Sequence, residues 1–235
     1  KRESIVNNNF NKNKIIVALD YTDKKHALML SEQLDPSYCR LKIGKQLFTK
    51  YGPSIVDDLQ EMNFEIFLDL KFHDIPATVY KACLEAYKLG IWMLNIHLLG
   101  GKEMVIAAKE ARDTVNKKSK IIGVTLLTNH NKESMHYLGM DNREEIVNVL
   151  SVMANDAKID GIVCSPGDIM SINKSKNNLE FITPGIRLSH DSDDHSKIYT
   201  PSIALELGST YLVIGRPITE AEDPMSIVEK IRLMI

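Results

Sequence analysis

The chain has 235 residues, of which 44% are hydrophobic and 26% charged, a composition that fits one globular domain and excludes a disordered chain. Its 29 basic and 31 acidic residues give a formal net charge of −2, so there is no bulk basic field to attract nucleic acid. No apolar run reaches the roughly 18 residues that a membrane span needs, and we therefore expect neither nucleic acid nor a membrane as a partner.

The amino-terminal segment and the cysteines both point to the cytoplasm. Residues 1–13 are rich in asparagine and lysine and lack the apolar core of a secretory signal, so we expect a mobile segment there. Residues 14–235 are expected to form one catalytic domain. Cys39, Cys83 and Cys164 lie far apart in apolar stretches, where a cysteine usually acts as a small buried hydrophobe, and we expect all three to be reduced.

Short apolar runs rich in branched residues recur along the chain, and most are followed by a longer segment with helical spacing. This alternation is typical of parallel βα units. The predicted strands are Ile15–Asp20, Cys39–Gly44, Glu65–Lys71, Trp92–His97, Lys120–Leu127, Ile159–Ser165, Leu179–Gly185 and Ser209–Gly215.

Helices are predicted between several of these strands, many with polar residues at the start and glycine after the end. The predicted helices are Lys45–Met62, Thr78–Leu89, Lys102–Val115, Arg143–Lys158 and Pro224–Met234. Two connections are long, Thr128–Asn142 after the fifth strand and Arg187–Tyr199 after the seventh. The second is strongly polar, which suits a lid over an active site.

Eight βα units of this kind predict an α/β fold, the (β/α)8 or TIM barrel. The alternative is an open doubly wound sheet, which usually carries a GxGxxG turn after its first strand. Tyr21, Thr22 and Asp23 occupy that position here, so the barrel is favoured. In a barrel of this type the active site lies at the carboxyl ends of the strands.

Charged residues gather where the first three predicted strands end. Asp20 closes the first, Lys42 lies near the end of the second, and Asp69 and Lys71 end the third, with Asp74 shortly after. Residues two apart on a strand point to the same face, so Asp69 and Lys71 should project together. Structural ion pairs are the alternative explanation, but desolvating this many charges is costly. The cluster therefore favours a reaction that moves charge, with a lysine as general acid.

The loops after the last two predicted strands have the position and the residues of a phosphate site. They read TPGIR, 183–187, and IGRPIT, 214–219, and barrels commonly bind phosphate at these loops. Gly215 permits close approach of the backbone, and Arg216 offers a bidentate guanidinium. The alternative is a turn glycine followed by a solvated arginine, but the arginine directly follows an apolar strand at the expected catalytic face.

The run DLKFHDIPATV, from Asp69 to Val79, resembles the DxKxxD signature of the orotidine 5'-phosphate decarboxylase family. It is supported in order by ALDY, LKIG, NIHLLGG, LLT, TPGIR and IGRPIT, so the resemblance covers nearly the whole chain from Ile15 onward. It implies a homodimer that needs neither cofactor nor metal. The implied reaction converts orotidine 5'-phosphate to UMP and CO2 in de novo pyrimidine biosynthesis.

The resemblance also implies a role for each matching residue. Lys71 would deliver a proton to C6 of the pyrimidine, Asp69 would face the substrate carboxylate, and Asp74 would reach into the partner's active site. Lys42 would join these three in one alternating network. The implied substrate contacts are Asp20 and Lys42 to the ribose hydroxyls, Thr78 from the other subunit, Thr128 to the pyrimidine, and Arg187, Gly215 and Arg216 to the phosphate.

One residue departs from the family pattern. The family usually has a glutamine in the loop before the last helical unit, in a run that begins DQ and continues to TP, whereas this chain reads DHSKIYTP. His195 stands at that place. We include it as a substrate contact, through a hydrogen bond to phosphate or pyrimidine that would depend on pH.

Two other functions stay open at this stage. The sugar-phosphate enzymes 3-keto-L-gulonate 6-phosphate decarboxylase and hexulose-phosphate synthase look similar around DxKxxD but use Mg²⁺. We expect them to have an acidic residue where this chain has Lys42, because a cation repels the metal. A non-catalytic barrel that binds a nucleotide phosphate is the second alternative, but it has no need for Lys42 and Lys71 beside three aspartates.

Asn95 and His97 lie two apart on the fourth predicted strand and therefore face one side. A single histidine with no second ligand at metal spacing does not make a metal site. We expect both side chains to form hydrogen bonds to neighbours or to pack in the barrel, and we expect no metal site.

Overall fold

The computed structural model describes residues 14–127, 129–130, 132–172, 178–188 and 199–235. Its strands are β1 (Ile15–Leu19), β2 (Arg40–Gly44), β3 (Ile66–Phe72), β4 (Met93–His97), β5 (Lys120–Val124), β6 (Gly161–Val163), β7 (Glu180–Thr183) and β8 (Tyr211–Ile214). Neighbouring strands pair in parallel in sequence order, and β8 pairs with β1 to close the barrel. The predicted (β/α)8 barrel is therefore confirmed.

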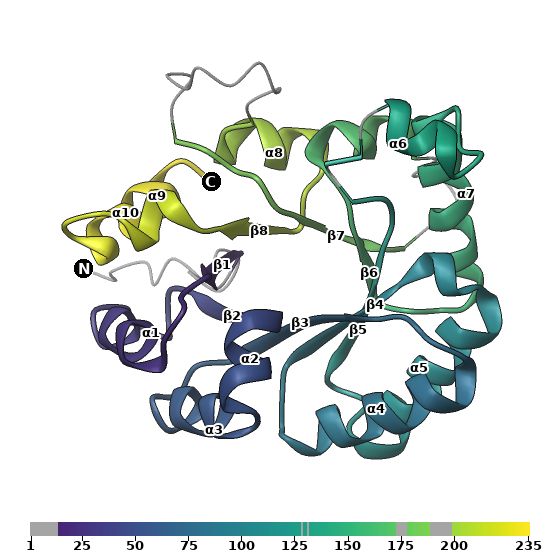
Figure 1. Ribbon diagram of the computed structural model, residues 1–235. Helices are drawn as coiled ribbons and strands as arrows, with labels where there is room; N and C mark the ends of the chain where they lie inside the picture. Colours follow the sequence, from purple (N-terminus) through teal and green to yellow (C-terminus); the bar gives the residue numbers. More distant parts are fainter. Residues whose placement is uncertain (1–13, 128, 131, 173–177, 189–198) are drawn as a thin grey trace, which may run out of the picture.

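Helices surround the barrel as an outer ring (Figure 1). The α-helices are α1 (Lys24–Ser31), α2 (Lys45–Tyr51), α3 (Ser54–Glu61), α4 (Pro76–Lys88), α5 (Lys102–Val115), α6 (Lys132–Tyr137), α7 (Arg143–Asp156), α8 (Pro201–Leu207), α9 (Arg216–Thr219) and α10 (Pro224–Leu233). Two short 3-10 helices, η2 (Leu98–Gly100) and η3 (Pro166–Ser171), follow β4 and β6. Among the described residues, no helix has the length and apolar character that crossing a membrane requires.

The single helix predicted over Lys45–Met62 is wrong, because the structure has two helices, α2 and α3, in that stretch. Gly52 ends α2 with a positive φ of 61°, which glycine adopts without the steric cost that a Cβ would bring. Pro53 follows and has no backbone N–H to continue the hydrogen-bond ladder. The apolar periodicity continues across the break because both helices bury one face against the barrel.

The other differences concern the ends of elements and one loop. Helix α4 begins at Pro76 rather than at Thr78, since proline is well suited to the first turn of a helix. Strand β5 ends at Val124 rather than at Leu127. The predicted loop Thr128–Asn142 contains the short helix α6.

The predicted lid Arg187–Tyr199 is described only at its two ends. The backbone N–H of Arg187 donates to the carbonyl of Tyr199 at 3.0 Å, and Ile186 and Tyr199 form an isolated parallel bridge. The ends of this loop are therefore joined next to β7. Residues 189–198, like the amino-terminal segment 1–13, lie outside the described residues.

Apolar residues fill two layers, one inside the barrel and one between the barrel and the helices. Strand β1 contributes to both, because Ile16 and Ala18 point into the barrel whereas Ile15, Val17 and Leu19 pack toward the helices. Strands buried on both faces read as continuous apolar runs, which is why β1 was recognisable in the sequence. The inner layer consists of Ile16, Ala18, Phe67, Met93, Ile122, Ile182 and Val213.

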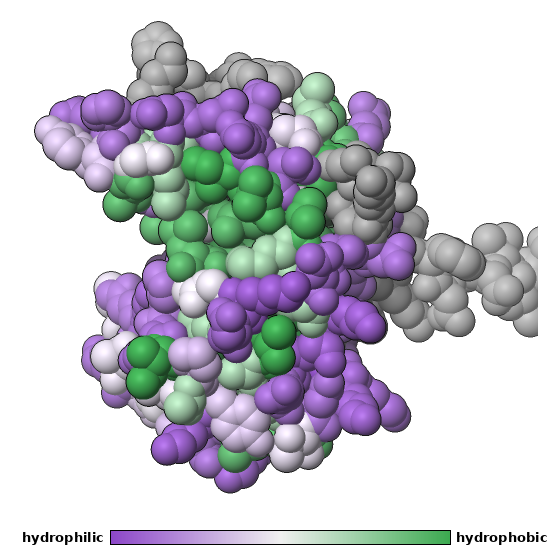
Figure 2. Space-filling model, turned by 90° about the vertical axis from the view of Figure 1, so that its right-hand side faces the viewer, coloured by the Kyte–Doolittle hydropathy of each residue, from purple (hydrophilic) through white to green (hydrophobic). Residues whose placement is uncertain are grey.

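The outer surface is mainly hydrophilic, with an exception on α7. Val149 and Val152 on this helix are 59% and 51% exposed, and Met170 on η3 is 73% exposed. Figure 2 shows that apolar side chains gather on this side of the molecule between two hydrophilic regions. Exposed apolar groups that cluster in this way are more typical of a contact surface than of a fully solvated helix.

A buried arginine links the helix ring to the amino-terminal end of the barrel. Arg112 on α5 is 5% exposed and donates to Asp160 Oδ2 at 2.6 Å and to the carbonyl of Ser119 at 2.9 Å. The same Asp160 oxygen accepts the backbone N–H of Ile121 at 2.8 Å. One guanidinium therefore joins α5 to the beginnings of β5 and β6.

Replacing this arginine should destabilise the barrel. We expect Arg112→Met to lower the free energy of unfolding by about 2–3 kcal/mol, because Asp160 and the Ser119 carbonyl lose a charged donor. Chemical denaturation measures the difference. Lys88→Met is the control, since the Lys88–Glu85 pair is exposed and such pairs contribute little. Equal effects of the two substitutions would contradict the proposed role of Arg112.

Candidate active site

A cavity of about 220 Å³ lies at the carboxyl end of the barrel. Four polar side chains from adjacent strands line one side of it, namely Lys42 from β2, Asp69 and Lys71 from β3, and Asn95 from β4. A larger and more open hollow of about 450 Å³ lies at the amino ends of the strands, next to Glu65 and Ser119. It contains none of the clustered charges, and the smaller cavity is therefore the candidate active site.

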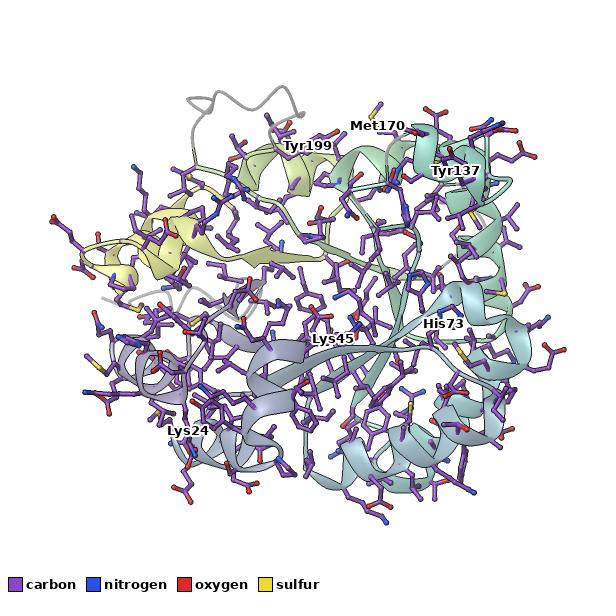
Figure 3. All side chains as sticks on the ribbon, viewed as in Figure 1. Lys24, Lys45, His73, Tyr137, Met170 and Tyr199 are labelled. Atoms are coloured by element: carbon purple, nitrogen blue, oxygen red, sulfur yellow. The ribbon has the colours of Figure 1, made fainter. Side chains whose placement is uncertain are left out.

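Lys42 and Lys71 share a single carboxylate, that of Asp69. Lys71 Nζ lies 2.5 Å from Asp69 Oδ1, and Lys42 Nζ lies 3.3 Å from Asp69 Oδ2. Lys42 Nζ also lies 3.3 Å from Asp20 Oδ1, so the charges alternate along the ends of β1, β2 and β3. The structure thus brings together four of the predicted site residues. Lys45, labelled in Figure 3 at the start of α2, marks the end of β2 beside this cluster.

Asp69 is the most buried acid of the cluster, with a side chain 12% exposed. Burial raises the pKa of its carboxyl, but the charges of Lys42 and Lys71 and the hydrogen bonds from Lys71 and Asn95 lower it by more. The net pKa lies below the ordinary value. At neutral pH the cavity wall therefore holds an ionised carboxylate between two ammonium groups.

Strand β3 is irregular where it carries these residues. Leu68 pairs with Leu94 on β4, but the next pair is Phe72 with Ile96, so β3 bulges between them. Within the bulge Lys71 has a φ of 51°, which is uncommon for a residue with a Cβ. Such backbone conformations persist where the surroundings impose them, and they concentrate at functional sites.

Asn95 lies opposite the bulge and forms hydrogen bonds to both of its functional residues. Its Oδ1 accepts the backbone N–H of Lys71 at 2.7 Å, and its Nδ2 donates to Asp69 Oδ1 at 2.6 Å. The hydrogen-bonding role expected for Asn95 is confirmed.

His97 packs against a second histidine at this end of the barrel. Its ring stacks on that of His73 with centroids 5.3 Å apart, and its buried Nδ1 has no hydrogen-bond partner among the described residues. Burial, together with the neighbouring His73 and Lys71, lowers the pKa of the His97 imidazole to about 4. The part of the chain that the structure describes contains no group of three or more His, Cys, Asp or Glu residues placed to hold a metal ion.

Asp74 and Thr78 do not line this cavity. They belong to an exposed stretch between β3 and the first turn of α4, in which Ile75 is 65% exposed. His73, labelled in Figure 3, begins this stretch. An open hollow of about 520 Å³ lies beside it, lined by Asp74, Ile75 and Leu99 among others.

The predicted phosphate residues lie at the carboxyl ends of β7 and β8. Arg216 is exposed and begins α9, and Arg187 directly follows the bridged residue Ile186. A Cβ built on Gly215 would lie 3.7 Å from Asp20 Oδ2, which places the end of β8 beside the charged cluster. Neither arginine has an ion pair within the described residues. Thr128 and His195, the two other predicted contacts, lie outside the described residues.

The rest of the cavity wall is apolar and was not predicted as part of the site. It is formed by Phe67, Val124, Leu126, Leu127, Val163, Cys164, Ile182, Pro184 and Val213. In the sequence these residues cannot be distinguished from the core, because most inward-facing positions of buried parallel strands are apolar. The cavity therefore offers one charged wall and one apolar wall to a ligand.

Two proteins of similar sequence carry the same name. The chain is 45% identical over 223 residues to the orotidine 5'-phosphate decarboxylase of Nitrosomonas eutropha, covering 94% of this chain and 96% of that protein. It is 46% identical over 220 residues to the protein of the same name from Saccharophagus degradans, covering 92% of each.

Solved structures and a family model agree with these relatives. The orotidine 5'-phosphate decarboxylase of Lactobacillus acidophilus has a TM-score of 0.82 at 32% identity, covering 94% of this chain and 97% of that one. The Methanocaldococcus jannaschii enzyme, solved with the inhibitor BMP, has a TM-score of 0.75 at 25% identity, covering 95% and 98%. The model of the orotidine 5'-phosphate decarboxylase / HUMPS family matches residues 13–231. The chain therefore belongs to the orotidine 5'-phosphate decarboxylase / HUMPS family.

Proposed function

We propose that this chain is an orotidine 5'-phosphate decarboxylase that forms UMP and CO2 in pyrimidine biosynthesis, with residues 14–235 as its single catalytic domain. The observation that carries the proposal is the Lys42–Asp69–Lys71 cluster, which forms the charged wall of an otherwise apolar cavity. Relatives about 45% identical over nearly the whole chain bear the name of this activity.

The charged wall suits the chemistry of this reaction. When the bond from C6 to the carboxylate breaks, CO2 leaves and the electron pair stays on C6 as a carbanion. A fixed ammonium group stabilises such charge, and in a closed site it does so without reorganisation of solvent. Lys71 then transfers a proton from Nζ to C6, which forms the new C–H bond and leaves the amine neutral until it takes a proton from water.

Asp69 has two roles in this proposal. It holds Lys71 Nζ at 2.5 Å, so the proton donor is in place before the substrate arrives. It would also face the carboxylate that departs, and the repulsion between the two would be relieved as CO2 forms. Lys42 fixes the second Asp69 oxygen and, with Asp20, is placed to hold the ribose hydroxyls.

The phosphate would lie at the ends of β7 and β8. Gly215 offers its backbone N–H, and Arg187 and Arg216 provide the guanidinium groups that a dianion prefers. Thr128 and His195 complete the proposed set, Thr128 at the pyrimidine and His195 at the phosphate or the pyrimidine. The phosphate lies far from the reacting carbon. Its contacts with the protein speed up the reaction only if they are stronger in the transition state than in the bound substrate.

The position of Lys42 argues against the Mg²⁺-dependent sugar-phosphate reactions. Its side chain is 10% exposed, and its Nζ lies 3.3 Å from both Asp20 and Asp69, the carboxylates that a metal ion would need. A divalent cation would have to displace this buried charge. The cluster therefore favours decarboxylation by a protein cation.

We further propose that the active protein is a homodimer in which Asp74 and Thr78 serve the partner's cavity. Both residues lie outside their own cavity on an exposed stretch that includes the apolar side chain of Ile75. In a two-fold dimer a residue on such a face can reach the equivalent face of the partner. Asp74 of the partner subunit would then extend the alternating charges beyond Lys71.

The direct test is turnover in the absence of metal. Purified protein treated with EDTA is mixed with orotidine 5'-phosphate, and the fall in ultraviolet absorbance is followed. We expect rapid conversion to UMP. Tight UMP binding without conversion would instead indicate a non-catalytic barrel. If neither occurs, and activity appears only with sugar phosphates and Mg²⁺, the proposed function is wrong.

Lys71→Ala should abolish most of the catalysis. We expect kcat to fall by several powers of ten, each worth about 1.4 kcal/mol of activation free energy, because both the proton donor and the stabilising cation are lost. Steady-state kinetics measure the change. Lys45→Ala is the matched control, because Lys45 is an exposed lysine at the same end of the barrel and forms no ion pair with the described residues. Near-normal turnover of the Lys71→Ala protein would exclude the proposed role.

Mixing two inactive variants tests the shared site. If Asp74 serves the partner, a mixed dimer of Lys71→Ala and Asp74→Ala subunits has one intact site and one doubly altered site. Random assortment should then restore about a quarter of the wild-type activity, since half of the dimers are mixed. If Asp74 serves its own subunit, no site is intact and the mixture stays inactive. Size-exclusion chromatography confirms that dimers form.

A further inference from the structure

The bulge of β3 leaves the backbone of Lys71 without a partner in the β-ladder. From the Leu68–Leu94 pair to the Phe72–Ile96 pair, β3 advances by four residues while β4 advances by two. Asp69, Leu70 and Lys71 therefore lie opposite the single residue Asn95. A buried backbone N–H without an acceptor is costly, so something other than the ladder must accept the N–H of Lys71.

The side chain of Asn95 takes the place of the missing ladder partner. Its carbonyl oxygen accepts the N–H of Lys71 at 2.7 Å, while its NH2 group donates to Asp69 Oδ1 at 2.6 Å. The same carboxylate oxygen accepts Lys71 Nζ at 2.5 Å. Asn95 is 1% exposed, so its amide is held by packing and does not exchange these bonds for water.

We propose that Asn95 is a positioning residue for the decarboxylation assigned above. One rigid amide sets the backbone of the proton donor and the orientation of the carboxylate that holds the donor. It acts through Lys71 and Asp69, and it fixes the left-handed conformation of Lys71 that directs Nζ into the cavity. This inference rests on the proposed function, because it concerns the residues proposed to carry out the reaction.

At neutral pH the asparagine amide satisfies both neighbours of position 95. The N–H of Lys71 requires an acceptor, and the ionised Asp69 requires a donor. Leucine supplies neither. Aspartate supplies the acceptor, but an ionised side chain has no donor and adds a second negative charge beside Asp69.

The test compares Asn95→Leu with the wild-type protein, and it uses Ser119→Ala as a matched control. Ser119 is 3% exposed and donates to the carbonyl of Ile91 at 2.8 Å, so its loss also removes a buried hydrogen bond, at the opposite end of the barrel. We expect Asn95→Leu to lower kcat by about 100-fold. The dissociation constant of Asn95→Leu for UMP, which has no leaving carboxylate, should stay within about threefold of the wild-type value. Ser119→Ala should keep the wild-type kcat.

Asn95→Asp provides a readout that loss of stability alone would not change. The charged groups that face position 95 are Asp69 and Lys71 and, through Asp69, Lys42; the titratable His97 lies two residues further along β4. Close carboxylates share a proton, and a protonated Asp at position 95 can donate to Asp69 as the amide does. The kcat of Asn95→Asp should therefore recover as pH is lowered and fall as pH rises, relative to the wild-type profile.

Each outcome decides between distinct explanations. If the wild-type protein has no decarboxylase activity, the proposed function is wrong, and so is the inference about Asn95. An active wild type with Asn95→Leu within threefold of its kcat, or an Asn95→Asp profile parallel to the wild-type profile, would overturn the inference alone. If Asn95→Leu fails to fold, the Asn95→Asp profile still decides, because that side chain has nearly the same shape.

Discussion

The structure of the site depends on one buried carboxylate held by two lysines. Without Lys42 and Lys71, Asp69 at 12% exposure would be an isolated charge in an apolar environment, and without Asp69 the two ammonium groups on the adjacent strands β2 and β3 would lose the carboxylate between them. For these charges to meet, the carboxyl ends of β1, β2 and β3 must lie next to one another. The parallel pairing of the barrel strands places them there. The register is continuous from β1 through β3, and it aligns Ala18 with Lys42 and Lys42 with Phe67.

The apolar interior of the barrel holds the charged side chains at this end in fixed positions. Below the cluster, the interior is filled by apolar side chains such as Ile16, Phe67 and Ile122, so the charged wall rests on a rigid layer. Interiors of this density deform little, and a side chain anchored there keeps its position. The irregular part of β3 is confined to the end of the strand, where the bulge changes the direction of Lys71 without disturbing the pairs beneath it.

The barrel and the charged cluster could be predicted from the sequence, whereas the bulge of β3, the break at Gly52 and the apolar cavity wall could not. Buried parallel strands are almost entirely apolar, so Lys42 and Asp69 stood out, and their places at strand ends brought them together. The bulge could not be predicted, because it depends on how Asn95 meets β3 across the sheet. Gly52 is a sign in the sequence that a helix ends. The apolar periodicity that continues from α2 into α3 nevertheless favoured the prediction of a single helix. The apolar wall of the cavity, including Val163 and Ile182, has the same pattern as the core.

The pairing of Arg187 with Tyr199 has a consequence for how this fold can vary among species. Because the two ends of the connection are joined by a backbone hydrogen bond of 3.0 Å, the strands beneath it do not depend on its length. Doubling the length of a flexible loop costs only about 0.6 kcal/mol in closure entropy. Insertions and deletions between these two positions should therefore cost the barrel little stability, so the length of this connection can vary while the scaffold stays constant.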